Sequence, residues 1–242
     1  MASEAAPGEA PPLLAVRGLK AYYDQFEALH GVDIMVGQGE IVSIIGANGA
    51  GKSSLLKSIL GQVDRVEGEI SLAGEPILGR STAAIVASGV ALVPEGRRLF
   101  PSLSVEENLW IGWDVGRRDG MTFEEIYDLF PALRERRHAA ARLLSGGQQQ
   151  MVAVGRALLA GPRLLLCDEI SLGLAPVVVS SLYELIPRVR ARGIGVLLVE
   201  QDISRSLAVS DRFYCLLEGH VSLAGRPAEA DHDTVMKHYF GL

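Results

Sequence analysis

Residues 46–53 have the types and spacing that bind phosphate. The segment reads Gly46-Ala-Asn-Gly-Ala-Gly-Lys-Ser53 and follows the apolar run Ile41–Ile45. Small residues let successive backbone N–H groups point at one anion, and a helix beginning near Lys52 adds the positive end of its dipole. The Lys52 ammonium would bind the β- and γ-phosphates, and the Ser53 hydroxyl would bind Mg²⁺. An ordinary glycine-rich turn is the alternative, but the strand before and the helix after favour nucleotide binding.

The residues that we expect to contact the nucleotide from this phosphate loop are Gly46, Asn48, Gly49, Ala50, Gly51, Lys52, Ser53 and Ser54.

Two adjacent carboxylates, Asp168 and Glu169, follow the apolar run Leu164–Cys167. A buried strand has no reason to end in paired acids unless something cationic or reactive lies there. Consecutive strand side chains point to opposite faces, so the two acids need not share one task. We expect Asp168 to hold Mg²⁺ and Glu169 to act as general base on the attacking water. A solvated strand end that starts a turn is the alternative, but the phosphate loop upstream favours the functional interpretation.

The elements that must position these residues alternate along the chain. Apolar runs predict strands at 13–17, 31–36, 41–45, 69–73, 90–93, 164–167 and 195–199, helices at 52–60 and 176–190, and a hairpin of 212–217 with 220–223. Strands that alternate with helices predict an α/β fold with a parallel sheet. Between 104 and 141 the strand runs vanish and helical spacing replaces them, which indicates a helical insert.

The domain organisation that follows is simple. Residues 1–12 are rich in Ala, Pro and Glu, and we expect a flexible leader rather than a signal peptide. Residues 13–242 are expected to form one domain, with a helical subdomain over about 96–155 inserted in the core.

Composition excludes other classes of protein. The 242 residues carry a formal charge of −6 and contain no dense Lys/Arg stripe, which argues against nucleic acid as the main partner. No apolar run approaches the roughly 18 residues of a membrane-spanning helix. The two cysteines, Cys167 and Cys215, lie in apolar runs and are expected to be buried thiols rather than a disulfide.

A second helix start suited to an anion lies at Leu144-Ser-Gly-Gly-Gln148, before the helical stretch 149–160. Ser145 can cap that helix, and the two glycines leave room for a close anion. A simple capped helix is the alternative. Because the domain already has one phosphate loop, a second helix start suited to an anion needs an explanation of its own.

Together these motifs resemble the ABC ATPase family, and the resemblance covers nearly the whole chain. It implies a P-loop NTPase core with a mixed, largely parallel sheet, an N-terminal antiparallel β subdomain and a helical insert that docks membrane subunits. It implies that two such domains dimerise head to tail. It also implies that Tyr23 stacks on adenine. Tyr22 could take this role instead, and Tyr23 could simply be an aromatic residue of a core strand. The residues that would close on the partner's γ-phosphate are Ser145, Gly146, Gly147 and Gln148.

Narrower features resemble one ATPase subunit of branched-chain amino-acid importers, a group similar to importers of urea and short amides. They lie in the segments 93–100, 102–109, 171–176 and 199–201. This resemblance implies a second, different ATPase, two permeases and a periplasmic solute-binding protein, at the cytoplasmic face of a bacterial inner membrane. ATP binding would close the ATPase dimer, and hydrolysis would reopen it.

Four positions depart from the usual ABC pattern. Glu95 stands where most members have glutamine, Gln201 where they have a switch histidine, Ala175 where they have aspartate and Ile170 where they have proline. All but Ile170 fit the importer subgroup. We expect Glu95 to contact nucleotide and Mg²⁺, and Gln201 to act in catalysis near the γ-phosphate.

Two other functions compete with the transport motor. The departures at Glu95 and Gln201 keep open a regulatory subunit with slow hydrolysis. A soluble ABC ATPase that works on DNA or ribosomes is disfavoured by the single set of motifs and the negative charge.

Overall fold

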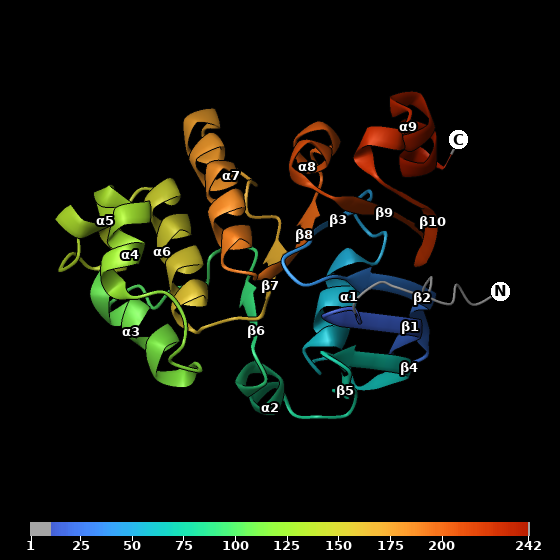
Figure 1. Ribbon diagram of the computed structural model, residues 1–242, viewed down its shortest axis with the longest axis horizontal. Coiled ribbons are helices and arrows are strands. Elements are labelled where there is room, and N and C mark those ends of the chain that lie inside the picture. Colours follow the sequence, from blue (N-terminus) through green and yellow to red (C-terminus); the bar gives the residue numbers. More distant parts are fainter. Residues whose placement is uncertain (1–10, 242) are drawn as a thin grey trace.

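The structure, a computed structural model, describes residues 11–241 without the side chain of His232. The predicted leader therefore lies almost entirely outside the described residues. Two sheets form the core of the fold (Figure 1). The smaller has the order β2-β1-β4-β5 and consists of the antiparallel strands Leu14–Tyr23 (β1), Phe26–Val36 (β2), Arg65–Leu72 (β4) and Glu75–Pro76 (β5).

The larger sheet has the order β10-β9-β3-β8-β7-β6. All its neighbouring pairs are parallel except the hairpin of β9 with β10. Its strands are Ile41–Ile45 (β3), Val90–Val93 (β6), Leu164–Asp168 (β7), Gly195–Glu200 (β8), Arg212–Leu217 (β9) and His220–Gly225 (β10). Every residue of β3 and β8 is buried, as expected for parallel strands that are covered on both faces.

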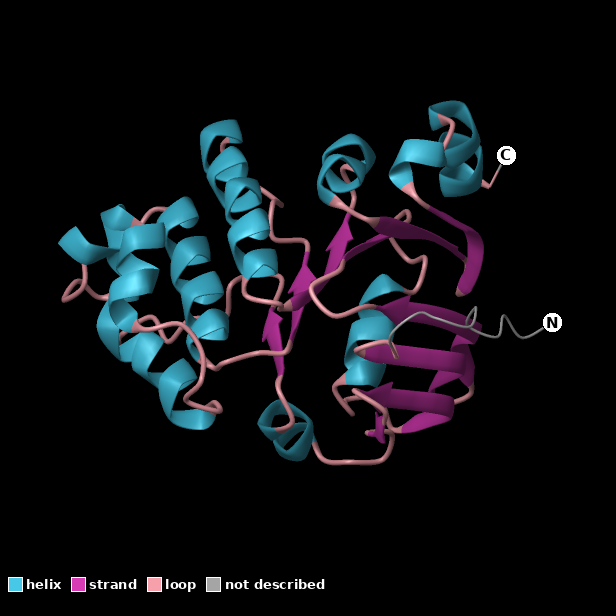
Figure 2. Cartoon of the chain, in the orientation of Figure 1, coloured by secondary structure: helices cyan, strands magenta, loops and turns pink. Residues whose placement is uncertain are grey.

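Helices cover the larger sheet and extend away from it on one side (Figure 2). The α-helices are Lys52–Ile59 (α1), Thr82–Ala87 (α2), Val105–Val115 (α3), Phe123–Leu129 (α4), Pro131–Glu135 (α5), Gly146–Leu159 (α6), Pro176–Ala191 (α7), Ile203–Val209 (α8) and His232–Phe240 (α9). Helix α1 lies between the two sheets, while α3 to α6 gather at the far end (Figure 1). No helix within residues 11–241 is long and apolar enough to cross a membrane.

Strand register brings the predicted chemistry together. Ile45 pairs with Glu200, and Val199 pairs with Asp168, so β3, β8 and β7 end at one level. The residues that follow these strands therefore leave the sheet at the same edge, as in other open parallel sheets that bind ligands there. The mixed sheet, the antiparallel N-terminal sheet and the helices agree with the predicted fold class.

Several predicted boundaries were wrong. Strands β1, β2 and β4 are longer than predicted because they pair along most of their length. Helix α6 begins at Gly146 rather than Gln149, because Ser145 and Gln148 form a reciprocal capping box. Helices α2, α8 and α9 were not predicted. Cys167 and Cys215 are free and buried, as expected.

Candidate nucleotide site

A cavity of about 850 Å³ opens where β3, β7 and β8 end. Ten predicted site residues line it: Tyr23, Asn48, Gly49, Gly51, Lys52, Ser53, Ser54, Glu95, Glu169 and Gln201. They come from the antiparallel sheet, the phosphate loop and the ends of three parallel strands, so the fold gathers residues from 23 to 201 around one volume.

The phosphate loop is shaped for close backbone approach. Gly51, the N-cap of α1, has φ of 105°, and a Cβ there would lie 2.8 Å from Leu29 Cδ2. A Cβ at Gly46 would lie 2.5 Å from the Leu216 carbonyl oxygen. Gly51 therefore requires glycine because of its left-handed φ, and Gly46 because a side chain would clash with the backbone of β9.

Lys52 supplies a positive charge inside the cavity. Its side chain is largely buried, and Nζ donates to the carbonyl oxygens of Gly46 and Ala47 at 2.8 and 3.2 Å. Nζ also lies 3.6 Å from Glu169 Oε1. The ammonium is thus held at the centre of the loop, where a bound phosphate would compete with these acceptors for it.

Glu169 is fixed from two sides. Its Oε2 accepts a hydrogen bond from Gln201 Nε2 at 2.6 Å, opposite the Lys52 contact. Glu169 lies one residue beyond β7 and has φ of 47°, so the expected strand alternation does not extend to it. The left-handed backbone, rather than the strand pleat, turns this carboxylate into the cavity.

Asp168, the last residue of β7, has a different environment. Within the described residues, its buried Oδ1 has no hydrogen-bond partner. Burial, followed by the charges of Glu169 and Glu95, raises the pKa of Asp168 to about 6. A buried carboxylate oxygen without a partner, near two other acids, fits a cation ligand. A bound cation would offset the burial of the charge, supply the missing partner and reduce the repulsion between the acids.

Tyr23 rather than Tyr22 lines the cavity. The Tyr23 ring is 36% exposed and lies at the end of β1, paired with Phe26 across the hairpin. The Tyr22 ring is covered by the Arg65 guanidinium, 4.2 Å from its centroid. The Lys57 ammonium lies farther from the Tyr23 ring, 6.0 Å from its centroid, so Tyr23 is the better placed of the two to stack on a base.

Seven further residues line the cavity and were not predicted: Phe26, Glu27, Ala28, His30, Leu172, Glu218 and Gly219. Most come from the β1–β2 hairpin and from the tip of the β9–β10 hairpin. Gly219 N donates to the Ala50 carbonyl at 3.0 Å, which fixes that tip on the phosphate loop. The Glu218-Gly219 turn was predicted, but nothing in its sequence signalled this position.

The second predicted anion site is not part of this cavity. Among the described residues that line the cavity, none comes from 145–148. Ser145 Oγ accepts from Gln148 N at 3.3 Å, and Gln148 Oε1 accepts from Ser145 N at 3.1 Å. In Figure 1, α6 lies beyond β6 and β7 from α1. The two helix N-termini that were predicted to bind anions, those of α1 and α6, thus lie apart within one chain.

Comparison with known proteins identifies the family in which these motifs occur together. Residues 29–171 match the family model described as ABC transporter. The high-affinity branched-chain amino acid transport ATP-binding protein BraG of Pseudomonas aeruginosa is 43% identical over 211 residues, 86% of this chain and 91% of that protein. The fructose import ATP-binding protein FrcA of Rhizobium meliloti is 34% identical over 219 residues, 84% of each chain.

Solved structures agree. The ADP conformation of an ATP-binding cassette of an ABC transporter superposes with a TM-score of 0.82 at 26% identity, over 96% of this chain and all of that one. The cavity lined by the phosphate loop and Glu169 thus belongs to a chain whose sequence and fold both match ATP-binding subunits of ABC transporters. This chain belongs to the ABC transporter family and is an ATP-binding, ATP-hydrolysing subunit of a transporter that also contains permease subunits.

Proposed function

We propose that this chain drives import of branched-chain amino acids. The 43% identity to the amino-acid transport protein, against 34% to the fructose import protein, supports this class of solute. Import of urea or short amides is the alternative. The solute itself would be bound by a periplasmic binding protein and two permeases, with this chain at the cytoplasmic face of a bacterial inner membrane.

We propose further that ATP is hydrolysed in a head-to-tail pair of ATPases. The observation that carries this is the separation of the Lys52 cavity from Ser145, Gly146, Gly147 and Gln148. The start of a helix is a ready anion site, and among the described residues that line the cavity none comes from the helix start at 145–148. ATP binding would close the pair around both sets, and hydrolysis would reopen it. The partner would be a different ATPase chain.

Within the cavity, the residues would have different roles. Lys52 and the phosphate-loop N–H groups would bind the phosphates, and Tyr23 would stack on adenine. Glu169 would take a proton from the attacking water, with Gln201 holding its carboxylate in place. The residues that would hold Mg²⁺ are Ser53, Glu95 and Asp168, and the ion when bound would neutralise phosphate charge.

A regulatory subunit with slow hydrolysis is the second candidate. It is favoured by one observation: Gln201 and Lys52 both bind the Glu169 carboxylate. A base that is hydrogen-bonded on one oxygen and ion-paired on the other is less available to water. Phosphate release from this site in the assembled transporter separates the two candidates.

The test of the proposed function is purification of the chain with its partners from membranes, followed by reconstitution in vesicles. We expect two permeases and a second ATPase to co-purify. We expect ATP hydrolysis to rise when a binding protein loaded with leucine or isoleucine is added, and not with urea or fructose. Stimulation by one of those other solutes would replace the amino-acid assignment, and a symmetric homodimer would replace the heterodimer.

A further inference from the structure

Glu200 is a buried carboxylate beside the cavity that none of the proposed steps uses. It is only 2% exposed, although it immediately precedes Gln201. Its Oε1 accepts from Ser171 N at 3.2 Å, and its Oε2 accepts from Ser171 Oγ at 2.8 Å. Both carboxylate oxygens therefore bind one residue of the loop that follows Glu169.

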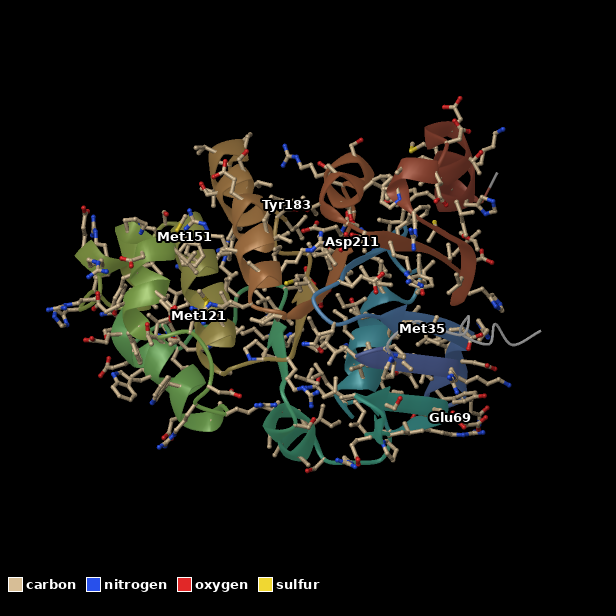
Figure 3. The ribbon with its side chains drawn as sticks, in the orientation of Figure 1. Met35, Glu69, Met121, Met151, Tyr183 and Asp211 are labelled. Atoms are coloured by element: carbon tan, nitrogen blue, oxygen red, sulfur yellow. The ribbon has the colours of Figure 1, made fainter. Side chains whose placement is uncertain are left out.

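Glu200 is a carboxylate in a buried place. Burial raises its pKa, the Ser171 hydrogen bonds and the nearby Tyr183 hydroxyl lower it, and the charge of Glu169 raises it. Figure 3 shows Tyr183 on the side of α7 that faces α8, and burial followed by the Glu200 charge raises the pKa of Tyr183. Burying a carboxylate is costly, so Glu200 calls for a role that an apolar residue could not fill.

That role is suggested by the backbone of Glu169. Its φ of 47° lies in the left-handed region, which a residue with a side chain adopts only when its surroundings hold it there. On the strand side, Glu169 N donates to the Val199 carbonyl at 2.9 Å. On the loop side, Leu172 N donates to the Glu169 carbonyl at 3.1 Å, and Ser171 is bound by Glu200.

Two consecutive residues at the end of β8 thus bind two residues of this loop. Gln201 holds the Glu169 side chain, and Glu200 holds the Ser171 backbone and hydroxyl. We propose that Glu200 is a positioning residue for ATP hydrolysis, which keeps the loop 169–172 in the conformation that presents the Glu169 carboxylate to the cavity. This inference rests on the proposed role of Glu169 as base.

Glutamine replaces Glu200 only with weaker hydrogen bonds. Ser171 offers two donors, N–H and O–H, and a carboxylate offers a charged acceptor to each. A glutamine can accept from the Ser171 N–H and donate its NH₂ to the Ser171 oxygen, because a hydroxyl also accepts, but it carries no charge. Glu200→Gln therefore keeps the size of the side chain but removes the charge, and hydrogen bonds to a charged group are roughly twice as strong as neutral ones. Ser171→Ala removes the hydroxyl bond alone, and Ser171→Thr keeps both.

The first measurement is amide hydrogen exchange of the full chain without nucleotide. We expect exchange of residues 169–172 to be at least about tenfold faster in Glu200→Gln and Ser171→Ala, because the first removes the charge that strengthens both hydrogen bonds and the second removes one of them. Ser171→Thr and the control Glu184→Gln, which removes a charge from the exposed side of α7, should exchange as the parent chain does. Unchanged exchange in both test variants would overturn the proposal.

The second measurement is steady-state hydrolysis by the transporter that co-purifies with the chain, with the partner ATPase disabled. Small displacement of a catalytic group costs up to about 100-fold, so kcat should fall about 10- to 100-fold in Glu200→Gln and Ser171→Ala. The KM for ATP should stay within about threefold, since the phosphate loop is untouched. The double variant should be no slower than the slower single variant, because both act on the same contact.

If Glu200→Gln and Ser171→Ala merely destabilised the fold, the result would differ. The kcat, the nucleotide affinity and the melting temperature would then fall together in both variants, and Ser171→Thr would not preserve activity. Should Glu200→Gln fail to fold, Ser171→Ala and Ser171→Thr still decide the matter. Glu169→Gln in the same assembly tests the base itself: if Glu169→Gln stops turnover while Glu200→Gln and Ser171→Ala turn over normally, only the positioning role fails.

Discussion

Gln201 Nε2 donates to Glu169 Oε2 at 2.6 Å, so the residue at the usual switch position binds the residue at the usual base position within one chain. The other oxygen, Oε1, lies 3.6 Å from Lys52 Nζ. ATP phosphates would draw Lys52 away from Glu169 and leave the Gln201 contact as the one that orients the carboxylate.

Lys52→Ala should abolish useful ATP binding. Lys52 is buried, and removing one partner of a buried, hydrogen-bonded charge pair costs about 2–5 kcal/mol, at least about 30-fold in Kd. Fluorescent nucleotide titration of the purified chain measures the loss. Lys20→Ala, on the exposed side of β1, is the matched control and should bind normally. Near-normal affinity in Lys52→Ala would mean that the phosphates bind elsewhere.

Tyr23→Ala should weaken ATP binding, whereas Tyr22→Ala should not. Stacking of a base on an aromatic ring is worth about 1–3 kcal/mol, or roughly 5- to 150-fold in Kd. Tyr23 lines the cavity, while the Tyr22 ring is covered by Arg65. Tyr23→Phe should keep most of the affinity because it keeps the ring. The reverse ranking of the two alanine variants would transfer the role to Tyr22.

Asp168→Asn should raise the melting temperature of the nucleotide- and metal-free chain at pH 7.5. The folded pKa of about 6 lies above the unfolded value of about 3.9, so the charged carboxylate destabilises the fold above pH 6. As the pH falls from 6 toward 4, Asp168 is protonated in the folded state and the advantage of asparagine should shrink. Thermal melts across this range measure it, with the exposed Asp64→Asn as control. A lower melting temperature for Asp168→Asn at pH 7.5 would contradict the unpaired, buried carboxylate.

The same variant should lose hydrolysis in the assembled transporter although it is more stable. Asparagine offers a neutral oxygen where Mg²⁺ is proposed to bind, and hard cations favour carboxylates. Phosphate release as a function of Mg²⁺ concentration tests this. Unchanged Mg²⁺ dependence would move the metal site away from Asp168.

The isolated chain should hydrolyse ATP weakly. Residues 145–148 do not line the cavity of their own protomer within the described structure, so a complete site needs a second chain. Adding the partner ATPase and permeases should raise turnover well above the sum of the parts. Specific activity should also stay flat as the isolated chain is concentrated, whereas a rise would indicate a homodimer. Full, solute-independent activity of the chain alone would count against the heterodimer.

Local motifs predicted residues that the structure brings together around Lys52. The phosphate loop, Lys52 and the paired acids could be read from sequence because a strand, a glycine-rich turn and a helix are all fixed by residues within about a dozen positions. Ser145 could be predicted as a helix cap for the same reason, because a cap is also defined by neighbouring residues. In each case the chemistry and the local conformation depend on the same few residues.

Contacts between distant segments could not be predicted in this way. The tip at Gly219 reaches the cavity because β9 pairs with β3, and the binding of Ser171 by Glu200 depends on the register of β7 against β8. Neither contact leaves a spacing pattern in the sequence. Glu169 departs from strand alternation for a related reason, since its left-handed backbone is held by Val199 on the neighbouring strand.

The most direct test of the account is the ranking of Glu169 against Gln201. General-base loss costs about 10²–10⁴ in rate, whereas one transition-state hydrogen bond costs at most about 10²–10³. Gln201→His should be tolerated, because histidine can also donate to Glu169. The assay must use the assembled transporter with the partner's catalytic glutamate replaced, so that phosphate release reports this site alone.

In that assay, Glu169→Gln should bring phosphate release close to background while ATP stays bound, and Gln201→Ala should retain measurable turnover. Turnover in Glu169→Gln at the rate of the parent chain, or Gln201→Ala as inactive as Glu169→Gln, would contradict the assignment of Glu169 as the base.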